Sequence, residues 1–167
     1  MNPLRRFSPA TFFIVLVTYL FYTGSATEYD IVTGSIVALI VSFIVGHWIV
    51  KDELKFFSPR RWAYAVFFAL RYFLIEETKT HIDVAKRVFT LKANPGIVRI
   101  PLEVENDYGK VLVANSITNT PGTVVVDISD DGKWLYVHWI DVSTLDEKEV
   151  KENVVAYFED YARKIFD

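Results

Sequence analysis

The hydrophobic pattern divides the chain into an almost uncharged N-terminal part and a charged C-terminal part. Two apolar runs, residues 10–22 and 29–50, are separated by a short polar loop. Between residues 7 and 50 the charged side chains are Glu28 and Asp30, and the sequence has one histidine there, His47. With its flanks (residues 7–25) the first run approaches the roughly 20 residues that cross a bilayer, and the second reaches that length. The pattern predicts a hairpin of two membrane helices.

The first run opens with Ser8-Pro9. Serine caps helix N-termini, and proline is well tolerated at the first helical position. A cleaved signal peptide is the alternative interpretation. Residues 23–27 lead directly into the second apolar run, however, and this favours a helix that is retained.

Small residues recur every four positions along the second run, at Gly34, Ala38, Ser42 and Gly46. At helical spacing they form one ridge, and such ridges let another helix backbone approach closely inside a membrane. These four residues are therefore the helix-packing candidates. The alternative is chance, because small residues are common in membrane helices.

The charges around the two runs indicate their orientation. The loop between the runs carries Glu28 and Asp30 but no lysine or arginine, whereas the flanks carry the basic residues Arg5, Arg6, Lys51, Lys55, Arg60 and Arg61. By the positive-inside rule both flanks lie in the cytoplasm. The sequence thus predicts a multi-pass protein of the cell membrane whose C-terminal domain is cytoplasmic.

A second Ser-Pro pair, Ser58-Pro59, predicts the start of a long helix that continues to Phe89. Its first half is apolar but is interrupted by Arg71, and one predicted stripe contains Phe68, Tyr72, Ile75, Ile82 and Phe89, with Lys79 and Lys86 interrupting it. Two placements remain open. The segment is either a third membrane helix, in which Arg71 faces protein, or an amphipathic helix at the cytoplasmic surface. The second is favoured because it keeps the charged C-terminal half inside.

After the turn at Asn94-Pro-Gly96 the pattern changes to that of a small α+β domain. Strands are predicted at residues 97–104, 123–128 and 134–141, with a hairpin turn at 130–132. Residues 110–117 fit a strand or a short helix. Thr144 and Glu147 form a predicted capping box before a helix with an apolar face. The chain accordingly divides into residues 1–90, the hairpin and the long helix, and residues 91–167, a cytoplasmic α+β domain.

Composition limits the chemistry that this chain can perform. The net charge of −3 argues against a nucleic-acid partner, and the absence of cysteine excludes disulfides and thiol catalysis. The three histidines lack metal-ligand spacing, and no phosphate loop or nucleophile elbow is present. We therefore predict no catalytic, cofactor or metal residues. Two rival functions remain: a membrane enzyme that pairs His138 with Asp127 or Asp141, and a free-standing, membrane-anchored binding domain.

Polar side chains that could contact a partner gather in two places. The segment 115–122 is dense in residues that hydrogen-bond their own backbone, so it is either a stiff loop or a docking surface. Glu76 and Glu77 are interpreted as a solvated helix face. The docking candidates are Asn115, Ser116, Thr118, Asn119, Thr120 and Arg71.

Three segments carry a resemblance to a known family. They are Asn94-Pro-Gly-Ile-Val-Arg-Ile-Pro-Leu102, the stretch 111–127 and Leu135-Tyr-Val-His-Trp-Ile140. Together with the apolar hairpin and the basic start of the long helix, they resemble the MrpE/MnhE family, which supplies one of the small subunits of the multisubunit sodium/proton antiporters (Mrp or Mnh type). Asn119 departs from the pattern, since a hydrophobic residue is expected there.

The resemblance implies an accessory, structural subunit that supports assembly and ion transport without an active site or cofactor of its own. Its partners would be the lipid bilayer and other membrane subunits of the complex, the larger of which hold the ion paths. The same module occurs in archaeal membrane-bound hydrogenase-type complexes, which couple ferredoxin oxidation to ion pumping. Such a complex is the alternative parent assembly.

Overall fold

The computed structural model describes residues 7–167, apart from the side chain of His47. The chain divides between Pro59 and Arg60 into two compact units, which are described separately below. The sequence places its boundary after residue 90 instead, where the long helix ends. The structure places it earlier because the long helix packs on the C-terminal domain and belongs to that unit.

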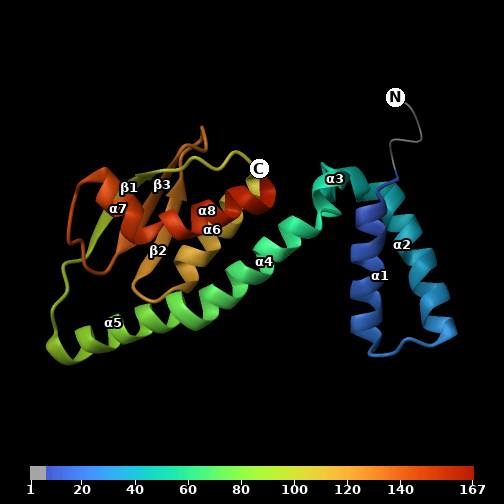
Figure 1. Cartoon of the computed structure of the whole chain (residues 1–167), viewed down its shortest axis with the longest axis horizontal. Coiled ribbons are helices and arrows are strands. Elements are labelled where there is room, and N and C mark those ends of the chain that lie inside the picture. The colour runs from blue at the N-terminus through green and yellow to red at the C-terminus, as the bar shows by residue number, and fades with distance from the viewer. Residues whose placement is uncertain (1–6) are drawn as a thin grey trace. The chain divides into compact units, whose positions relative to one another are not determined.

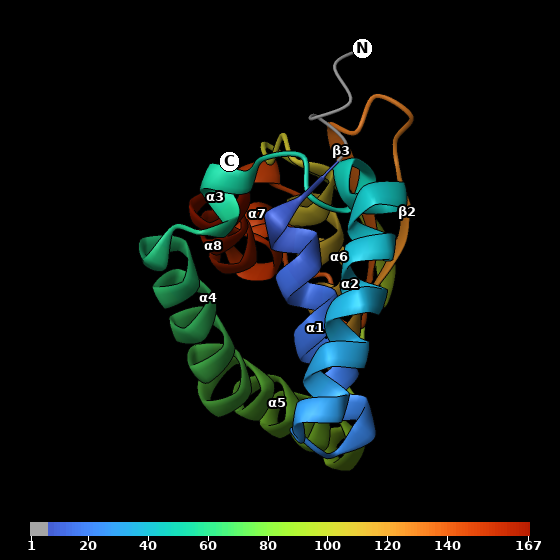
Figure 2. The ribbon, with the colours of Figure 1, turned by 90° about the vertical axis from the view of Figure 1, so that its right-hand side faces the viewer.

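The first unit is a helical hairpin closed by a short third helix. Helix α1 (Pro9–Thr23) and helix α2 (Glu28–Ile49) lie side by side (Figures 1 and 2). The Ser8 hydroxyl accepts the Thr11 N–H at 3.1 Å, which confirms the predicted helix start. Gly24, with φ at +64°, ends α1, and a capping box of Thr27 and Asp30 opens α2.

Contacts at both ends of the hairpin show that its helices are antiparallel. Near the loop, the Tyr19 and Thr33 hydroxyls are 3.0 Å apart, and at the opposite end Ser8 hydrogen-bonds Ser42. Among the described residues, one helix is long and apolar enough to cross a membrane, over Glu28–Gly46. Helix α1 is apolar but shorter, with 15 residues.

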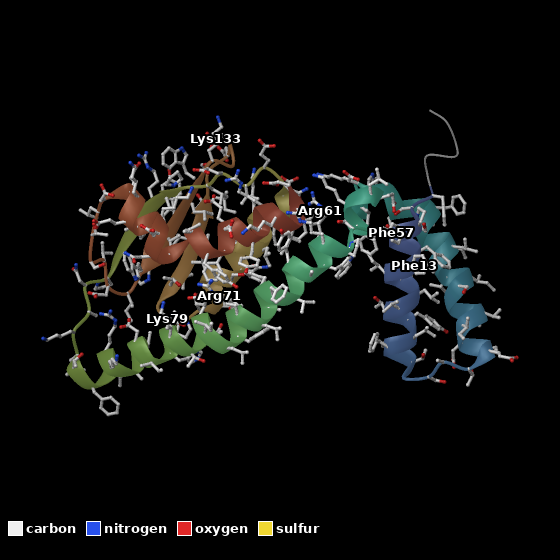
Figure 3. The ribbon with its side chains drawn as sticks, viewed as in Figure 1. Phe13, Phe57, Arg61, Arg71, Lys79 and Lys133 are labelled. Atoms are coloured by element: carbon white, nitrogen blue, oxygen red, sulfur yellow. The ribbon has the colours of Figure 1, made fainter. Side chains whose placement is uncertain are left out.

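Helix α3 (Glu53–Phe56) folds back onto the start of α1. A Glu53 carboxylate oxygen accepts the Ala10 N–H at 2.9 Å, and the Ser8 hydroxyl donates to the other oxygen. Phe57 packs edge-on against Phe13, with ring centroids 6.0 Å apart (Figure 3). Because the first N–H groups of a helix lack partners within the helix, this carboxylate stabilises the N-terminus of α1.

The second unit begins with the long helix, which runs continuously through α4 (Pro59–Arg71), η2 (Tyr72–Glu76) and α5 (Glu77–Thr90) (Figure 1). The segment η2 is a π-turn, in which the Glu77 N–H bonds the Tyr72 carbonyl, five residues earlier. Leu91, with φ at +53°, ends the helix close to the predicted position.

The π-turn corrects the single apolar stripe that the sequence predicts for this helix. A π-turn accommodates one extra residue, so the face that packs on the domain shifts by one position beyond it. Phe68 and Tyr72 are buried, whereas Ile82 and Phe89 are 52% and 88% exposed. After the turn, the half-covered positions are instead Glu77, Thr80, Val84 and Arg87.

Strands β1 (Gly96–Pro101), β2 (Thr123–Ile128) and β3 (Trp134–Trp139) form an antiparallel sheet in the order β1-β3-β2. Val98 and Val125 flank Val137, and the β2–β3 register shifts between Val125 and Asp127. The hairpin turn predicted at residues 130–132 is confirmed, and Gly132 adopts the positive φ of +67° that such turns require.

Helices α6 (Asp107–Asn119), α7 (Glu147–Val154) and α8 (Ala156–Phe166) complete the unit. The ambiguous segment 110–117 is helical, since Gly109, Val113 and Ile117 bury one face at helical spacing. The predicted capping box at Thr144 is wrong: Asp146 is the N-cap and accepts the N–H groups of Lys148 and Glu149.

The core of this unit lies where one face of the sheet meets the helices. Its buried residues come from β1, β3, α6, α7, α8 and the long helix, and include Phe68, Tyr72, Ile100, Val113, Ile117, Leu135, Val137, Val150, Phe158 and Ala162. The sequence predicts one C-terminal helix with an apolar face; the structure has two, α7 and α8, and buried residues of both belong to this core. The long helix is held to the domain by this same core.

Candidate docking site

An open groove of about 490 Å³ runs between the long helix and α6, inside the second unit. The long helix contributes the aromatic side chains Phe68, Tyr72 and Phe73. Helix α6 contributes Leu112 and four of the predicted docking residues: Asn115, Ser116, Thr118 and Asn119. One wall is thus aromatic and the other presents amides and hydroxyls, a combination that suits a protein segment with both apolar and polar groups.

The predicted docking residues differ in how accessible they are. Asn115, Thr118 and Asn119 are at least partly exposed, whereas Ser116 and Thr120 are 5% and 3% exposed. The Thr120 hydroxyl donates to the Ile117 carbonyl at 2.8 Å and so satisfies the end of α6. The segment that the sequence treats as a loop is therefore the last turn of a helix, and Ser116 and Thr120 support the surface from inside.

Tyr72, Glu77 and Asn119 form a hydrogen-bonded cluster at one end of the groove. The Tyr72 hydroxyl donates to a Glu77 carboxylate oxygen at 2.7 Å, and the Asn119 amide donates to the Tyr72 hydroxyl at 2.8 Å and to Glu77 at 3.1 Å. Burial raises the pKa of Tyr72 to about 12, with the Asn119 hydrogen bond opposing this shift and Glu77 adding to it. The cluster ties the end of α6 to the π-turn.

Glu76 and Glu77 are not the solvated helix face that the sequence predicts. Their side chains are 16% and 14% exposed. Glu76 pairs with Arg71 at 3.2 Å, and a Glu77 oxygen lies 3.2 Å from His81 Nδ1. Both carboxylates are covered because the π-turn brings them beside partners on their own helix and, for Glu77, beside α6.

Arg71 lies apart from the residues that line the groove. Its guanidinium sits over the Tyr157 ring of α8, 4.4 Å from the centroid, while half of the side chain remains exposed (Figure 3). An arginine over an aromatic face is held by charge–quadrupole attraction. Arg71 therefore orients the long helix against α8 and still presents its exposed half to the surroundings.

The four helix-packing candidates all face α1 within the first unit. Ala38 and Ser42 are fully buried, and the Ser42 hydroxyl accepts the Ser8 N–H at 3.1 Å and donates to the Ser8 carbonyl at 2.6 Å. A Cβ atom at Gly34 would lie 2.7 Å from Tyr19 Cδ1, and one at Gly46 would lie 2.6 Å from Ser8 Cβ. Small residues are therefore needed for the hairpin itself to close.

The residues of the enzyme hypothesis are engaged elsewhere. His138 lies half-exposed on β3 and is paired in register with Ile97 and Val124. Asp141 binds Arg87 Nη1 at 2.6 Å, and Asp127 accepts the Ile128 N–H at 2.8 Å. Within residues 7–167 no group of three or more His, Cys, Asp or Glu residues is placed to hold a metal ion.

Sequence reasoning missed the aromatic wall of the groove and the Tyr72–Glu77–Asn119 cluster. The (i, i+4) pair Phe68 and Tyr72 was visible as part of an apolar stripe. Its relation to α6 was not visible, because residues 72 and 119 meet only through tertiary packing and the π-turn.

Comparison with known proteins gives consistent matches. A family described as Na+/H+ ion antiporter subunit (MNHE) matches residues 12–165. The chain is 34% identical over 155 residues to the E1-type Na(+)/H(+) antiporter subunit of Staphylococcus aureus, covering 92% of this chain and 93% of that protein. It is 33% identical over 141 residues to the E-type Na(+)/H(+) antiporter subunit of Alkalihalophilus pseudofirmus, covering 83% and 85%.

A solved structure of a larger assembly also contains a similar chain. It is the membrane-bound sulfane sulfur reductase, described as an archaeal respiratory membrane complex. The similarity has a TM-score of 0.79 at 32% sequence identity and covers 93% of this chain and 96% of the other. Both the hairpin and the C-terminal unit fall within a match of this extent.

Proposed function

The chain belongs to the MNHE family of Na+/H+ antiporter subunits, and from this premise we propose that it is an accessory, structural subunit of a multisubunit cation/proton antiporter, with no active site of its own. The family match over residues 12–165 carries this proposal, because it includes both units. The groove is open, Asp127 accepts a backbone N–H and Asp141 pairs with Arg87. These observations support a structural role over a catalytic one.

In this role the hairpin crosses the bilayer twice and the C-terminal unit lies in the cytoplasm. Helix α2 has the necessary length, and α1 with Phe7 and Ser8 reaches the lower limit of roughly 17 residues. Glu28 and Asp30 mark the outer loop, and the basic side chains that follow α2 mark the inner end.

The groove between the long helix and α6 is the docking site for a segment of a neighbouring membrane subunit. The amide of Asn115 can pair with backbone groups of that segment, and Phe68, Tyr72 and Phe73 can pack on its apolar side chains. The exposed half of Arg71 provides a further contact beside the groove.

Gentle detergent purification of the tagged native chain, followed by mass spectrometry of the proteins that accompany it, tests the subunit role. We expect large, many-helix antiporter-type subunits. The variant Asn115→Trp, which fills the groove, should reduce their recovery at least severalfold. The matched control Glu152→Trp, at an exposed site on α7, should leave it unchanged. A native chain that runs alone and remains folded would instead support a free-standing, membrane-anchored binding domain.

The parent assembly can also be a respiratory complex of the hydrogenase type. The observation in favour is the match to the chain of the membrane-bound sulfane sulfur reductase, with its TM-score of 0.79. The same mass spectrometry decides between the two assemblies. Iron–sulfur or hydrogenase-type subunits in the purified material would identify a respiratory complex, and their absence beside antiporter subunits would identify a stand-alone antiporter.

A further inference from the structure

We infer that the outward face of the long helix binds the surface of an anionic phospholipid bilayer, with apolar side chains inserted between the headgroups and lysines next to the phosphates. The inference rests on the proposed membrane hairpin and adds a second, peripheral membrane contact to it. It concerns the helix face opposite Phe68 and Tyr72, and therefore a surface that the core of the second unit leaves uncovered.

The first half of the outward face is almost wholly apolar. Five large side chains of α4 and η2 are between 53% and 70% exposed: Trp62, Val66, Phe67, Leu70 and Leu74. They recur at helical spacing, and Figure 3 shows side chains of the long helix projecting away from the sheet. A contiguous exposed apolar face of this size on one helix marks an interaction surface.

The π-turn extends this face into the second half of the helix and gives it positive charge. Beyond the turn the covered positions are Thr80, Val84 and Arg87, so Ile82 and Phe89 are turned outward together with Lys79 and Lys86. Lysines beside apolar side chains are typical of helices that lie in the plane of a membrane, since their stems cover apolar surface while their ammonium groups reach the phosphates.

The charge balance favours an anionic surface as the occupant. Residues 59–90 contain six Lys and Arg but three Asp and Glu, a net charge of +3 in a chain whose total is −3. The acids of the helix are engaged by basic or hydroxyl partners: Glu76 by Arg71, Glu77 by Tyr72 and Asp83 by Arg87 at 2.7 Å. Lys79 and Lys86 therefore dominate the field along the outward face of α5.

Covalent continuity favours lipid over a distant protein. Residues 50–58 alone connect the end of the membrane-crossing helix α2 to the start of the long helix, and part of that connection is folded into α3. Even a fully extended chain of this length reaches only about 30 Å. The start of the long helix, with Arg60 and Trp62, is thus held within reach of the headgroup layer, where basic and tryptophan side chains are favoured.

Single-cysteine labelling of the full chain tests the inference without interference, because the native chain has no cysteine. The chain is reconstituted alone into vesicles of phosphatidylethanolamine and phosphatidylglycerol, with spin labels at Leu70→Cys, Leu74→Cys or Ile82→Cys. Ile40→Cys, exposed on α2, reports the hairpin, and Lys133→Cys, on the β2–β3 turn, reports a site in water. Collisions with oxygen and with a water-soluble nickel chelate give the depth of each label.

We expect labels at positions 70, 74 and 82 to be accessible to oxygen and shielded from nickel, and the label at 133 to show the reverse. Nickel access at all three helix positions equal to that at 133 would overturn the inference. If that result comes with a lipid-exposed label at 40, the hairpin proposal survives. A label at 40 that is accessible to nickel means that the hairpin itself fails. Shielding from both reagents at 70 and 74 would show a protein contact with a second copy, and would also overturn the inference.

Charge variants test the anionic part separately. Lys79→Gln and Lys86→Gln should each lower the partitioning of the helix onto the anionic vesicles about fivefold, read as increased nickel access at position 82. The control Lys133→Gln should have no effect. Vesicles of phosphatidylcholine alone should show weak shielding for the native chain, and high salt should weaken the shielding on anionic vesicles. Equal shielding on both lipid compositions would exclude the role of the lysines.

Discussion

Glu159 is a carboxylate buried in α8, with 4% of its surface exposed. One oxygen accepts the Glu103 N–H at 2.5 Å, and the other lies 2.7 Å from Lys151 Nζ. Lys151 also contacts the Glu103 side chain at 2.9 Å, and Arg163 completes the network from α8. A buried carboxylate of this kind keeps the segment after β1 fixed to α7 and α8.

Replacing Glu159 by alanine should destabilise the second unit by about 1–3 kcal/mol, because the Glu103 N–H loses its acceptor and the half-buried Lys151 ammonium loses one of its two carboxylate partners. The measurement is the free energy of unfolding of the full chain in detergent. The control is Asp160→Ala, at the neighbouring residue, which removes an exposed ion pair with Lys164. It should change the free energy of unfolding by less than about 0.5 kcal/mol. Equal losses in the two variants would refute the role assigned to Glu159.

Two tyrosines should make the second unit sensitive to alkali. Burial raises the pKa of Tyr72 and of Tyr157 to about 12, from an ordinary value of 10.0. Because the folded state favours the neutral phenol, the free energy of unfolding is unaffected by these groups below pH 10. It falls as the pH rises from 10 towards 12, where the unfolded state ionises more readily than the folded state. Tyr72→Phe and Tyr157→Phe should each flatten the fall in stability over this range. Ultraviolet titration of the phenols checks the assignment, and a normal titration of all the tyrosines would contradict it.

At the scale of the elements, the hairpin shows how four small residues decide where one helix packs. The ridge on α2 is in contact with α1, and its Ser42 hydroxyl bridges to the backbone of Ser8. Sequence periodicity was sufficient to find the ridge, because small residues at every fourth position share one helix face. It could not name the partner, since the same pattern fits a helix of this chain or of another.

The double variant Ala38→Leu, Ser42→Leu should separate α1 from α2. Two large side chains cannot fit where both positions are fully buried against a neighbouring helix. Amide hydrogen exchange in lipid nanodiscs should rise along residues 9–23 and 28–49 of the variant. Ile40→Leu, on the exposed side of α2, is the control and should leave exchange unchanged. Unaltered protection in the double variant would show that the ridge does not hold the hairpin.

The helices and strands were largely predictable from the sequence, but the way in which they pack on one another was not. Capping residues and apolar spacing located the hairpin, the start of the long helix and the β2–β3 turn. The segment around Val113 and Ile117 stayed ambiguous, because short apolar runs fit strand and helix equally until packing decides. The groove could not be foreseen, because the long helix and α6 form its two walls only through tertiary packing. The Tyr72–Glu77–Asn119 cluster at its end also involves a π-turn at residues 72–76 that no local sequence signal marks.

At the scale of the whole molecule, the chain consists of two units, and it passes from the first to the second between Pro59 and Arg60. Each has its own packed interior: the α1–α2 contact in the first, and the core between sheet and helices in the second. Family membership assigns both to one subunit of a membrane complex. Separate interiors imply that the stability of one unit does not depend on the packing of the other.

Unfolding of the full chain should therefore occur in two transitions. Glu159→Ala should lower the transition of residues 60–167 and leave that of the hairpin unchanged. The ridge variant should do the opposite. Region-resolved hydrogen exchange at increasing denaturant measures both, and a single transition that both variants shift equally would show that the two units unfold as one.

The π-turn in the long helix has a consequence for how the gene can change. Before and after residues 72–76 the covered side chains recur at α-helical spacing. The π-turn inserts one extra amino acid between these two regular stretches. Loss of a single codon there would remove the extra amino acid and leave a regular helix in which Thr80 and Arg87 keep their covered positions. Gain of a single codon would instead rotate Thr80 and Arg87 out of these positions and bring Lys79 and Lys86 towards the domain. In this stretch, the gene can therefore lose one codon more easily than it can gain one.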